Sequence, residues 1–277
     1  MICLTGLAGS ASLLAQFSPS LLQNNSYWGD GKAEVDLYDA EIMREGQPRH
    51  CEVALILRRD TFTSEITVSS TPQPKAEAVT GLRLSQMVTV PVGLSCEQQS
   101  LSMFWDLAGN LLDGSLMTAT GKGNRVTRVE GAPEVHSLCT EVRNERGECT
   151  GMDFVVKNGS SVLYHELPVR VRTIDFSKTA AEFEFQMGPS LLNPDSFKKA
   201  SASYKINERA IEVEIREGGA LDRFILDRDF PFLLREWKMR DGSLLKLKNS
   251  LKADARNYTK NGDRERALKD PMLRHPD

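Results

Sequence analysis

Apolar and charged residues alternate along most of this chain with a period of two. AIEVEIREGGALDRFIL places Ile211, Val213 and Ile215 on one face and charged residues on the other, and Gly218-Gly219 separates two such runs. This period is typical of half-buried strands, and two runs joined by a glycine pair predict a β-hairpin. LLREWKMRDGSLLKLK has the same form around Asp241-Gly242. The last third of the chain therefore predicts consecutive hairpins.

The first half of the chain has the same character. The stretch Ser26–Leu57 predicts a founding hairpin, and LSMFWDLAGNLLDGSL predicts two short strands joined at Gly109-Asn110. Helix signals are weak, because SPSLLQNN is short and PSLLNPDSFKKASASY allows at most about two turns. We expect an all-β or strongly β-dominated fold. Its antiparallel curved sheet would form a half-barrel or a sandwich, with few short helices.

The length of 277 residues suffices for one large β domain or two modest ones. No clean linker interrupts the pattern, so we expect a single β-rich domain over residues 26–251. A change of pattern near Pro168 could divide it into halves, 26–167 and 168–251. Residues 252–277 carry seven Lys/Arg against five Asp/Glu and few apolar side chains, which predicts a disordered charged tail.

The N-terminal segment contains no charged residue before Asp30. Residues 1–25 are mildly apolar and rich in small side chains, which is typical of an export signal that lacks its basic region. The alternative is a disordered N-terminus of a cytoplasmic protein. We expect an extracytoplasmic location, in the periplasm or secreted, if the first interpretation holds. No apolar run is long enough to predict a transmembrane segment.

Five cysteines occur in the chain. Cys139 and Cys149 flank a polar stretch that contains Gly147 and could fold back as a hairpin, so they are the candidate disulfide. Cys51 and Cys96 are expected to be buried, inert thiols. No cysteine has the CxxC spacing of zinc or redox sites.

Net charge and motifs exclude several classes of function. The net charge of −3 provides no field for nucleic acid, so no nucleic-acid partner is expected. No nucleophile elbow, phosphate loop, dinucleotide fingerprint or helical metal pair occurs, and no pair of carboxylates is marked out. The histidines, including His165, read as ordinary surface or edge residues. We therefore expect no catalytic residues, no metal and no cofactor, and the chain leans towards a non-enzymatic role.

Aromatic residues are the remaining candidates for a site. They stand in or beside alternating runs, where they could pack a core or line an apolar groove that holds an acyl chain. We also expect the three tryptophans to lie on the same side of one curved sheet. The candidate ligand-binding residues are Trp28, Phe104, Trp105, Phe183, Phe185, Phe224 and Trp237.

Several of these segments resemble an uncharacterised family of secreted bacterial proteins that begins YWxxGKAEI. The matching residues are Tyr27-Trp28, Gly31-Lys32-Ala33-Glu34-Val35, Arg44-Glu45-Gly46, Val53–Leu57, Phe104-Trp105-Asp106-Leu107, Phe230-Pro231-Phe232 and Asp241-Gly242. Some members carry the name septum formation inhibitor Maf, but Pro19 is not followed by the arginines that Maf-type enzymes need for triphosphate. More distantly, the pattern resembles half-barrel envelope proteins of the lipoprotein-carrier type. The resemblance implies an extracytoplasmic, non-enzymatic role.

Three functions follow as hypotheses. The first is a non-enzymatic protein of the bacterial envelope, structural or binding, with an apolar small molecule or lipid as its partner. The second is a hydrolase that acts on an envelope polymer. The third is a protein-interaction module that uses a sheet edge. A lined apolar cavity would favour the first, and a pair of carboxylates at catalytic separation in a polar cleft would favour the second.

Overall fold

The computed structural model describes most of the chain, with only the backbone given for Thr63 and for the strands between residues 130 and 157. The described residues are 17–63, 78–120, 123–132, 135–143, 149–150, 153–157, 161–188, 190–192 and 197–254. The strands are β1 (Lys32–Arg44), β2 (Gln47–Thr63), β3 (Ala78–Val92), β4 (Ser95–Asp106), β5 (Leu111–Thr120), β6 (Gly123–Ala132), β7 (Val135–Arg143), β8 (Cys149–Thr150), β9 (Asp153–Lys157), β10 (Ser161–Leu163), β11 (Ala180–Gly188), β12 (Lys198–Ile206), β13 (Ala210–Glu217), β14 (Ala220–Asp227), β15 (Leu234–Lys238) and β16 (Leu244–Asp254).

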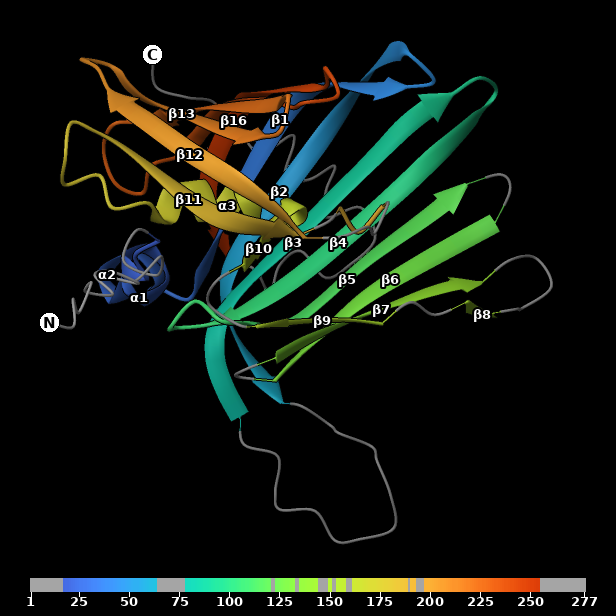
Figure 1. The fold of residues 1–277 in the computed structure, drawn as a ribbon, viewed down its shortest axis with the longest axis horizontal. Helices are drawn as coiled ribbons and strands as arrows, with labels where there is room; N and C mark the ends of the chain where they lie inside the picture. Colours follow the sequence, from blue (N-terminus) through green and yellow to red (C-terminus); the bar gives the residue numbers. More distant parts are fainter. Residues whose placement is uncertain are drawn as a thin grey trace, which may run out of the picture.

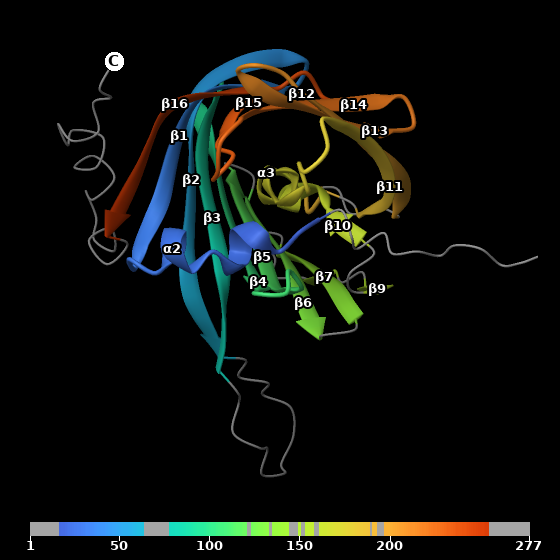
Figure 2. The same ribbon diagram turned by 90° about the vertical axis from the view of Figure 1, so that its left-hand side faces the viewer.

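These strands form one sheet in the order β10-β11-β12-β13-β14-β15-β16-β1-β2-β3-β4-β5-β6-β7-β8, with β9 also paired to β7. Neighbours are antiparallel except β10 and β11, which are parallel. The sheet curls until β11 and β12 face β3 and β4 across an interior (Figures 1 and 2). The predicted strongly β-dominated fold with a curved antiparallel sheet is confirmed, and its form is barrel-like.

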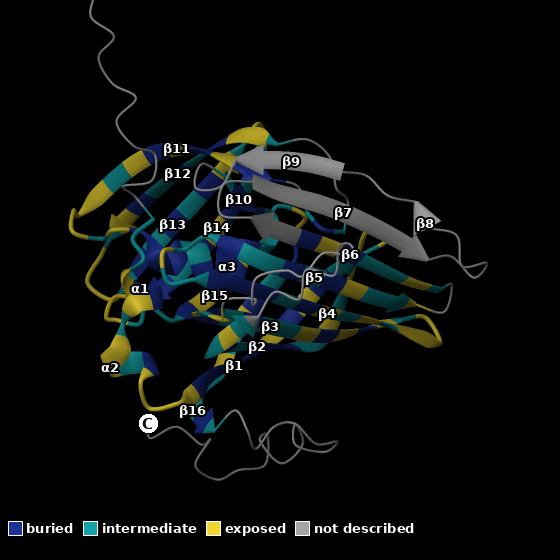
Figure 3. Ribbon diagram, turned by 90° about the horizontal axis from the view of Figure 1, so that it is seen from below, coloured by how far each residue is buried: buried dark blue, intermediate teal, exposed yellow. Residues whose placement is uncertain are grey.

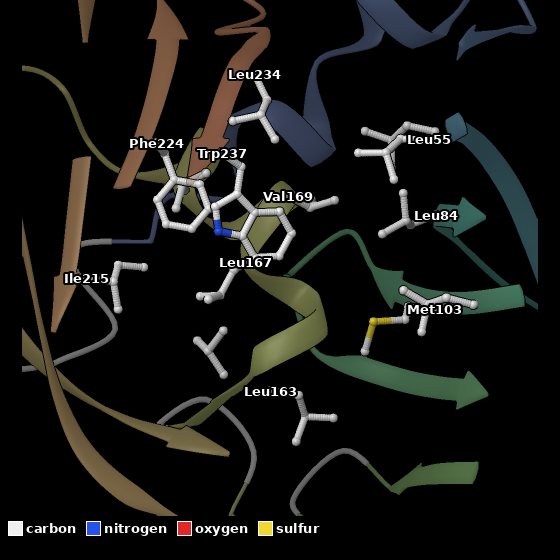
Figure 4. Packing of buried hydrophobic residues seen from close by; sticks show 14 of the residues in the cluster. Leu55, Leu84, Met103, Leu163, Leu167, Val169, Ile215, Phe224, Leu234 and Trp237 are labelled. Atoms are coloured by element: carbon white, nitrogen blue, oxygen red, sulfur yellow. The ribbon is translucent and has the colours of Figure 1, made fainter. Parts of the chain in front are cut away.

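A short helical segment fills the interior of the curled sheet, which we call the lumen. It consists of η2 (Tyr164–Glu166), α3 (Leu167–Arg170) and η3 (Val171–Thr173). Figure 2 shows α3 inside the curl, and Figure 4 shows it between the wall that carries Leu84 and the wall that carries Phe224. The helix can start here because proline is tolerated in the first helical turn, where Pro168 stands.

The helical segment is part of the main hydrophobic core. Leu167 is 0% exposed and Val171 is 0% exposed. Both belong to one cluster with apolar residues from β1 to β4 and from β11 to β16. Buried residues therefore concentrate along α3 and the strand faces that surround it, while exposed residues collect at the hairpin ends (Figure 3). A sheet curled this far needs such a filling, because an empty lumen would forfeit the packing of both walls.

The predicted C-terminal hairpins are present with the expected faces. In β13 the residues Ile211, Val213 and Ile215 are buried and alternate with half-buried charged side chains. The turn to β14 uses Gly218 at φ 57°, a left-handed conformation that glycine adopts without steric cost. The turn from β15 to β16 likewise uses Gly242 at φ 91°. The sequence pattern was sufficient here because one face of each strand is apolar.

Strand β1 turns two carboxylates, rather than apolar side chains, towards the lumen. Tyr38 and the even-numbered residues before it point into the lumen, so that Glu34 and Asp36 are buried at 1% and 3% exposure. Val35 lies on the opposite face, in a small separate cluster with Ala33. The two carboxylates are inside because their partners reach them from the helical segment and from β16.

The folded unit extends slightly beyond residues 26–251. Phe17 forms a β-bridge with Ile174, and α1 (Ser20–Gln23) buries Leu21 and Leu22 at 0% and 1% exposure. At the other boundary, β16 continues to Asp254. Both expected halves contribute to the same sheet. The expected export signal and charged tail otherwise fall on residues 1–16 and 255–277, which lie outside the described residues, so they stay predictions.

Candidate functional site

A cavity of about 350 Å³ opens at the end of the lumen where β1 finishes. We call it the open-end pocket. Apolar side chains from both walls and from α3 line it, among them Ile42, Val53, Val88, Pro168, Trp237 and Leu245. The curl of the sheet brings these distant strands together, and the helical segment forms the inner limit of the space.

His165 faces this pocket from η2. The residue is half-buried, and burial lowers its pKa to about 4, so the imidazole is uncharged at neutral pH. Its Nε2 lies 3.3 Å from Ser190 Oγ, and both residues line the pocket. The expectation of an ordinary surface histidine is wrong for His165, because strand spacing did not reveal that the chain turns inward there.

A Tyr–carboxylate–Arg cluster supports the same end of the lumen. Asp222 is 0% exposed, and its Oδ1 accepts a hydrogen bond of 2.8 Å from the Tyr164 hydroxyl. Arg240 Nε donates to the other carboxylate oxygen at 2.8 Å, and its Nη1 lies 2.5 Å from Glu217. Burial and the negative charge of Asp222 raise the pKa of the Tyr164 hydroxyl. Although burial acts to lower the pKa of Arg240, the hydrogen bond that Arg240 donates to Glu217 and the charge of Asp222 prevail and raise it.

Two further ion pairs lie at the rim. Arg44 on β1 reaches Glu97 on β4 at 2.9 Å, across the two strands between them. Lys198 on β12 lies 3.5 Å from Glu217. The rim is therefore charged, while the interior of the pocket is largely apolar.

The opposite end of the lumen is closed by a second cluster, which we call the closed-end cluster: Tyr27, Glu34, Asp36 and Arg172. Arg172 binds Glu34 with both terminal nitrogens, at 2.6 and 3.0 Å, and the Tyr27 hydroxyl donates to Glu34 at 2.5 Å. Ser250 Oγ donates to Asp36 at 2.5 Å. A cavity of only about 10 Å³ remains beside these residues, which is about the space of one water molecule.

The two carboxylates of this cluster have opposite pKa shifts. Burial acts to raise the pKa of Glu34, but the charge and hydrogen bonds of Arg172 prevail and lower it. Burial and the neighbouring charge of Glu34 raise the pKa of Asp36 well above its usual range. Asp36 therefore keeps its proton to a higher pH than an ordinary aspartate, and that proton can form a hydrogen bond to Glu34.

The predicted aromatic site residues are buried and do not share one site. Trp237 lines the open-end pocket and stacks on Phe224, with ring centroids 5.3 Å apart. Trp28 lies in α2 (Asn25–Trp28), before β1 begins and thus near the closed end, where its Nε1 donates to Leu21 at 2.7 Å. Trp105 donates to Glu166 at 2.7 Å within the core.

The phenylalanines are likewise divided between different places. Phe183 and Phe185 pack edge-to-face against Phe17, with centroids 5.4 and 5.7 Å away. Phe104 points to the outer face of β4, where it stacks on Phe62 and where a Cβ on Gly81 would lie 2.6 Å from its ring. The expectation of one concave aromatic surface is wrong for Phe104, because adjacent residues on a strand face opposite sides and Trp105 takes the inner side.

The described residues offer little catalytic chemistry. They contain no group of three or more His, Cys, Asp or Glu side chains that could hold a metal ion. The contact between Ser190 and His165 does not make an activated nucleophile, because an imidazole with a pKa of about 4 is a weak base at neutral pH. No helix in this part of the chain has the length and apolarity needed to cross a bilayer.

The cysteine predictions have mixed outcomes. Cys51 is a half-buried free thiol, and Cys96 is free but exposed, so the expected burial of Cys96 is wrong. The side chains of Cys139 and Cys149 lie outside the described residues. The described backbone pairs Cys149 with Arg143, four residues further along β7 than Cys139. The disulfide stays a prediction, which counting of free thiols would test.

Sequence reasoning missed the charged residues that organise both ends. Arg172 and Glu34 are 138 residues apart, and Asp222 lies on β14 while Arg240 lies in the turn between β15 and β16. Their spacing contains no local signal. The one available hint was the pair Glu34 and Asp36 on the same face of a strand whose other face is also apolar.

No protein-family model matches the chain, and no curated protein matches it in sequence. A solved DUF1089 family protein from Pseudomonas aeruginosa is similar in structure, with 12% identity, a TM-score of 0.39, and coverage of 64% of this chain and 96% of that one. A beta-barrel-like protein of the domain of unknown function DUF1849 from Brucella abortus has 11% identity, a TM-score of 0.47, and coverage of 81% and 99%. At this level of similarity, neither structure bears on ligand or activity. The resemblance to the YWxxGKAEI family stays a prediction.

Proposed function

We propose that this protein binds a small molecule with an apolar body in the open-end pocket. The observation behind the proposal is a mainly apolar cavity of about 350 Å³ beside the packed hydrophobic core of the lumen. Small-molecule sites are typically clefts of about 300–1,000 Å³, lined by apolar and aromatic side chains with a few polar groups. The pocket lies at the lower end of that range, which suits a compact ligand.

The position of the pocket also supports binding. The helical segment closes its inner side. The ion pairs of the rim strengthen each wall separately: Arg44 links β1 to β4, and Glu217 links β13 to β12 and to the turn after β15. A ligand there would contact Trp237 and Leu245 without displacing the helix. A preformed site of this kind avoids the free energy of reorganisation on binding.

An extracytoplasmic location is part of the proposal. It is supported by the uncharged, small-residue-rich composition of the N-terminal segment. Fractionation of host cells with an antibody to this protein tests it, and recovery in the cytoplasmic fraction alone would contradict it.

Titration with N-phenyl-1-naphthylamine, an uncharged apolar probe whose fluorescence rises away from water, tests the binding function. We expect saturable binding to the wild-type protein. Gln86→Phe, which fills the pocket from β3, should weaken it about tenfold or more because it removes space for the probe. Met87→Phe is the matched control, because Met87 is 45% exposed on the outer face of the same strand. Equal affinity in all three proteins would contradict the proposal.

A further inference from the structure

The cations of the open-end pocket are already neutralised. Among the described residues, the Lys and Arg side chains that line it are Arg44, Lys198 and Arg240. Arg240 holds two carboxylates, with nitrogen–oxygen distances of 2.5 Å to Glu217 and 2.8 Å to Asp222. A ligand carboxylate would therefore have to displace a protein carboxylate from this guanidinium.

The other two cations are also paired. Arg44 binds Glu97 at 2.9 Å, and both side chains are half-buried. Lys198 lies 3.5 Å from Glu217. The described part of the rim thus provides no unpaired positive charge at which a fatty acid or phosphate could be recognised.

Glu217, a carboxylate that lines the pocket, is paired, because it lies between Arg240 and Lys198. Asp222, behind the lining, accepts hydrogen bonds from Tyr164, Trp237 and the backbone and side chain of Arg240. Asp241 also lines the pocket, but it is exposed to solvent and accepts a hydrogen bond from the backbone N–H of Ser243. An exposed carboxylate attracts a cation only weakly, because water screens its charge.

Uncharged hydrogen-bonding groups are also part of the polar lining. Tyr164, Trp237, Ser243 and the NH2 group of Gln99 already have protein partners. The Gln86 amide, the Gln99 carbonyl, the Ser190 hydroxyl and the His165 ring, which burial keeps neutral, also line the pocket. Such groups can pair with a hydroxyl, amide or ester. A charged ligand group in the same place would lose its hydration without gaining a counter-ion, which is strongly unfavourable.

We infer that the ligand of the open-end pocket is uncharged, with an apolar body and a hydroxyl, amide or ester group. This inference rests on the function proposed above. It excludes fatty acids and phospholipid headgroups as the recognised chemistry.

A matched pair of probes tests the inference. N-phenyl-1-naphthylamine and 8-anilinonaphthalene-1-sulfonate share the same ring system and differ by one sulfonate. We expect the uncharged probe to bind at least about tenfold more tightly, because the sulfonate finds no free cation. Equal or tighter binding of the sulfonate overturns the inference and leaves the binding function standing. Failure of both probes to bind overturns the binding function and this inference with it.

Glu217→Gln sharpens the test, because it removes the carboxylate shared by Arg240 and Lys198. The sulfonate should then gain about tenfold in affinity, while the uncharged probe changes less than about twofold. Glu214→Gln is the matched control on the same strand, since Glu214 pairs with Arg223 on the outer face. Thermal melting by circular dichroism confirms that each variant is folded. An unchanged ratio of the two affinities in folded Glu217→Gln would overturn the inference.

Discussion

The two ends of the lumen carry the same three kinds of side chain and use them differently. At the closed end, Tyr27 and Arg172 bind Glu34, and Arg172 is 4% exposed. At the open end, Tyr164 and Arg240 bind Asp222, and Arg240 is 21% exposed.

What distinguishes the ends is the cover over each cluster. Helices α1 and α2 and the bridge from Phe17 to Ile174 lie over the closed end, where only about 10 Å³ stays unfilled. At the open end a cavity of about 350 Å³ persists beside the cluster. A buried ion pair therefore stabilises the packed interior at one end and shapes a pocket at the other.

The largest expected effect is loss of Arg172. Arg172→Met would leave Glu34 buried without its counter-ion, and we expect the free energy of unfolding to fall by about 3–5 kcal/mol. Arg240→Met should cost less, about 1–2 kcal/mol, because Arg240 is partly exposed and Asp222 keeps its other donors. Urea unfolding of both variants measures the difference, and equal losses would remove the distinction between the ends.

Substitution of two tryptophans tests the same difference between a filled core, where Trp105 lies, and the open-end pocket, which Trp237 lines. Trp105→Ala should cost about 3–4 kcal/mol, since it leaves a void in a filled core. Trp237→Ala should cost about 2 kcal/mol, because one side of that ring already borders the pocket. Trp237→Ala should also weaken N-phenyl-1-naphthylamine binding, whereas any folded Trp105 variant, such as Trp105→Phe, should retain it. The contrast would be contradicted if Trp237→Ala lost more stability than Trp105→Ala and kept its affinity for the probe, while folded Trp105→Phe lost that affinity.

The closed-end cluster predicts a specific pH dependence. The pKa of Asp36 in the folded protein lies above the unfolded value of about 3.9, so unfolding releases its proton. The stability that Asp36 contributes is complete below that value and is lost as pH rises towards the folded pKa. Glu34 has the opposite sign, because its lowered pKa makes its contribution disappear only as the pH falls below the usual range of a glutamate.

Asp36→Asn isolates this effect. Asparagine can donate to Glu34 and accept from Ser250, as the protonated acid does. We expect the variant to match the wild type near pH 4 and to become more stable than it as the pH rises, by at most about 1.4 kcal/mol per pH unit. His165 titrates in both proteins and cancels in the difference. Denaturant melts between pH 4 and 8 measure it, and a constant difference would mean that Asp36 is ionised throughout.

The smallest expected change in the free energy of unfolding is that of an exposed ion pair, which serves as the control for the two clusters. Lys199 and Glu184 form an exposed pair on neighbouring strands, away from both clusters. Lys199→Ala should change the free energy of unfolding by less than about 0.5 kcal/mol, because exposed ion pairs contribute little. A loss as large as that of Arg240→Met would show that the clusters at the lumen ends have no special role.

Much of the sheet could be predicted from the sequence, and little of the site. Alternation within a single strand predicts which side chains are buried, as it does for Ile211, Val213 and Ile215, because the signal for a half-buried strand is local. The inward turn at Tyr164 has no such signal. A segment enclosed on all sides needs no amphipathic period, and its charged residues find partners far away in the chain.

The same limit explains the aromatic residues. We grouped Phe104 with Trp105, although strict alternation places neighbouring residues of a strand on opposite faces. Alternation also does not distinguish a packed core from a pocket, because both present apolar side chains to the lumen. Whether space remains beside Trp237 depends on how far the helical segment reaches between the walls. That distance is a property of the assembled sheet rather than of any one strand.

The most direct test of the central claim is a crystal of the full chain soaked with 4-bromobenzyl alcohol, an uncharged molecule with an apolar ring and a hydroxyl group. Anomalous scattering from bromine locates the ligand independently of its shape. We expect the strongest bromine peak in the open-end pocket, in contact with Trp237, and none at the closed-end cluster. No peak in an accessible pocket, or a strongest peak elsewhere on the molecule, would contradict it.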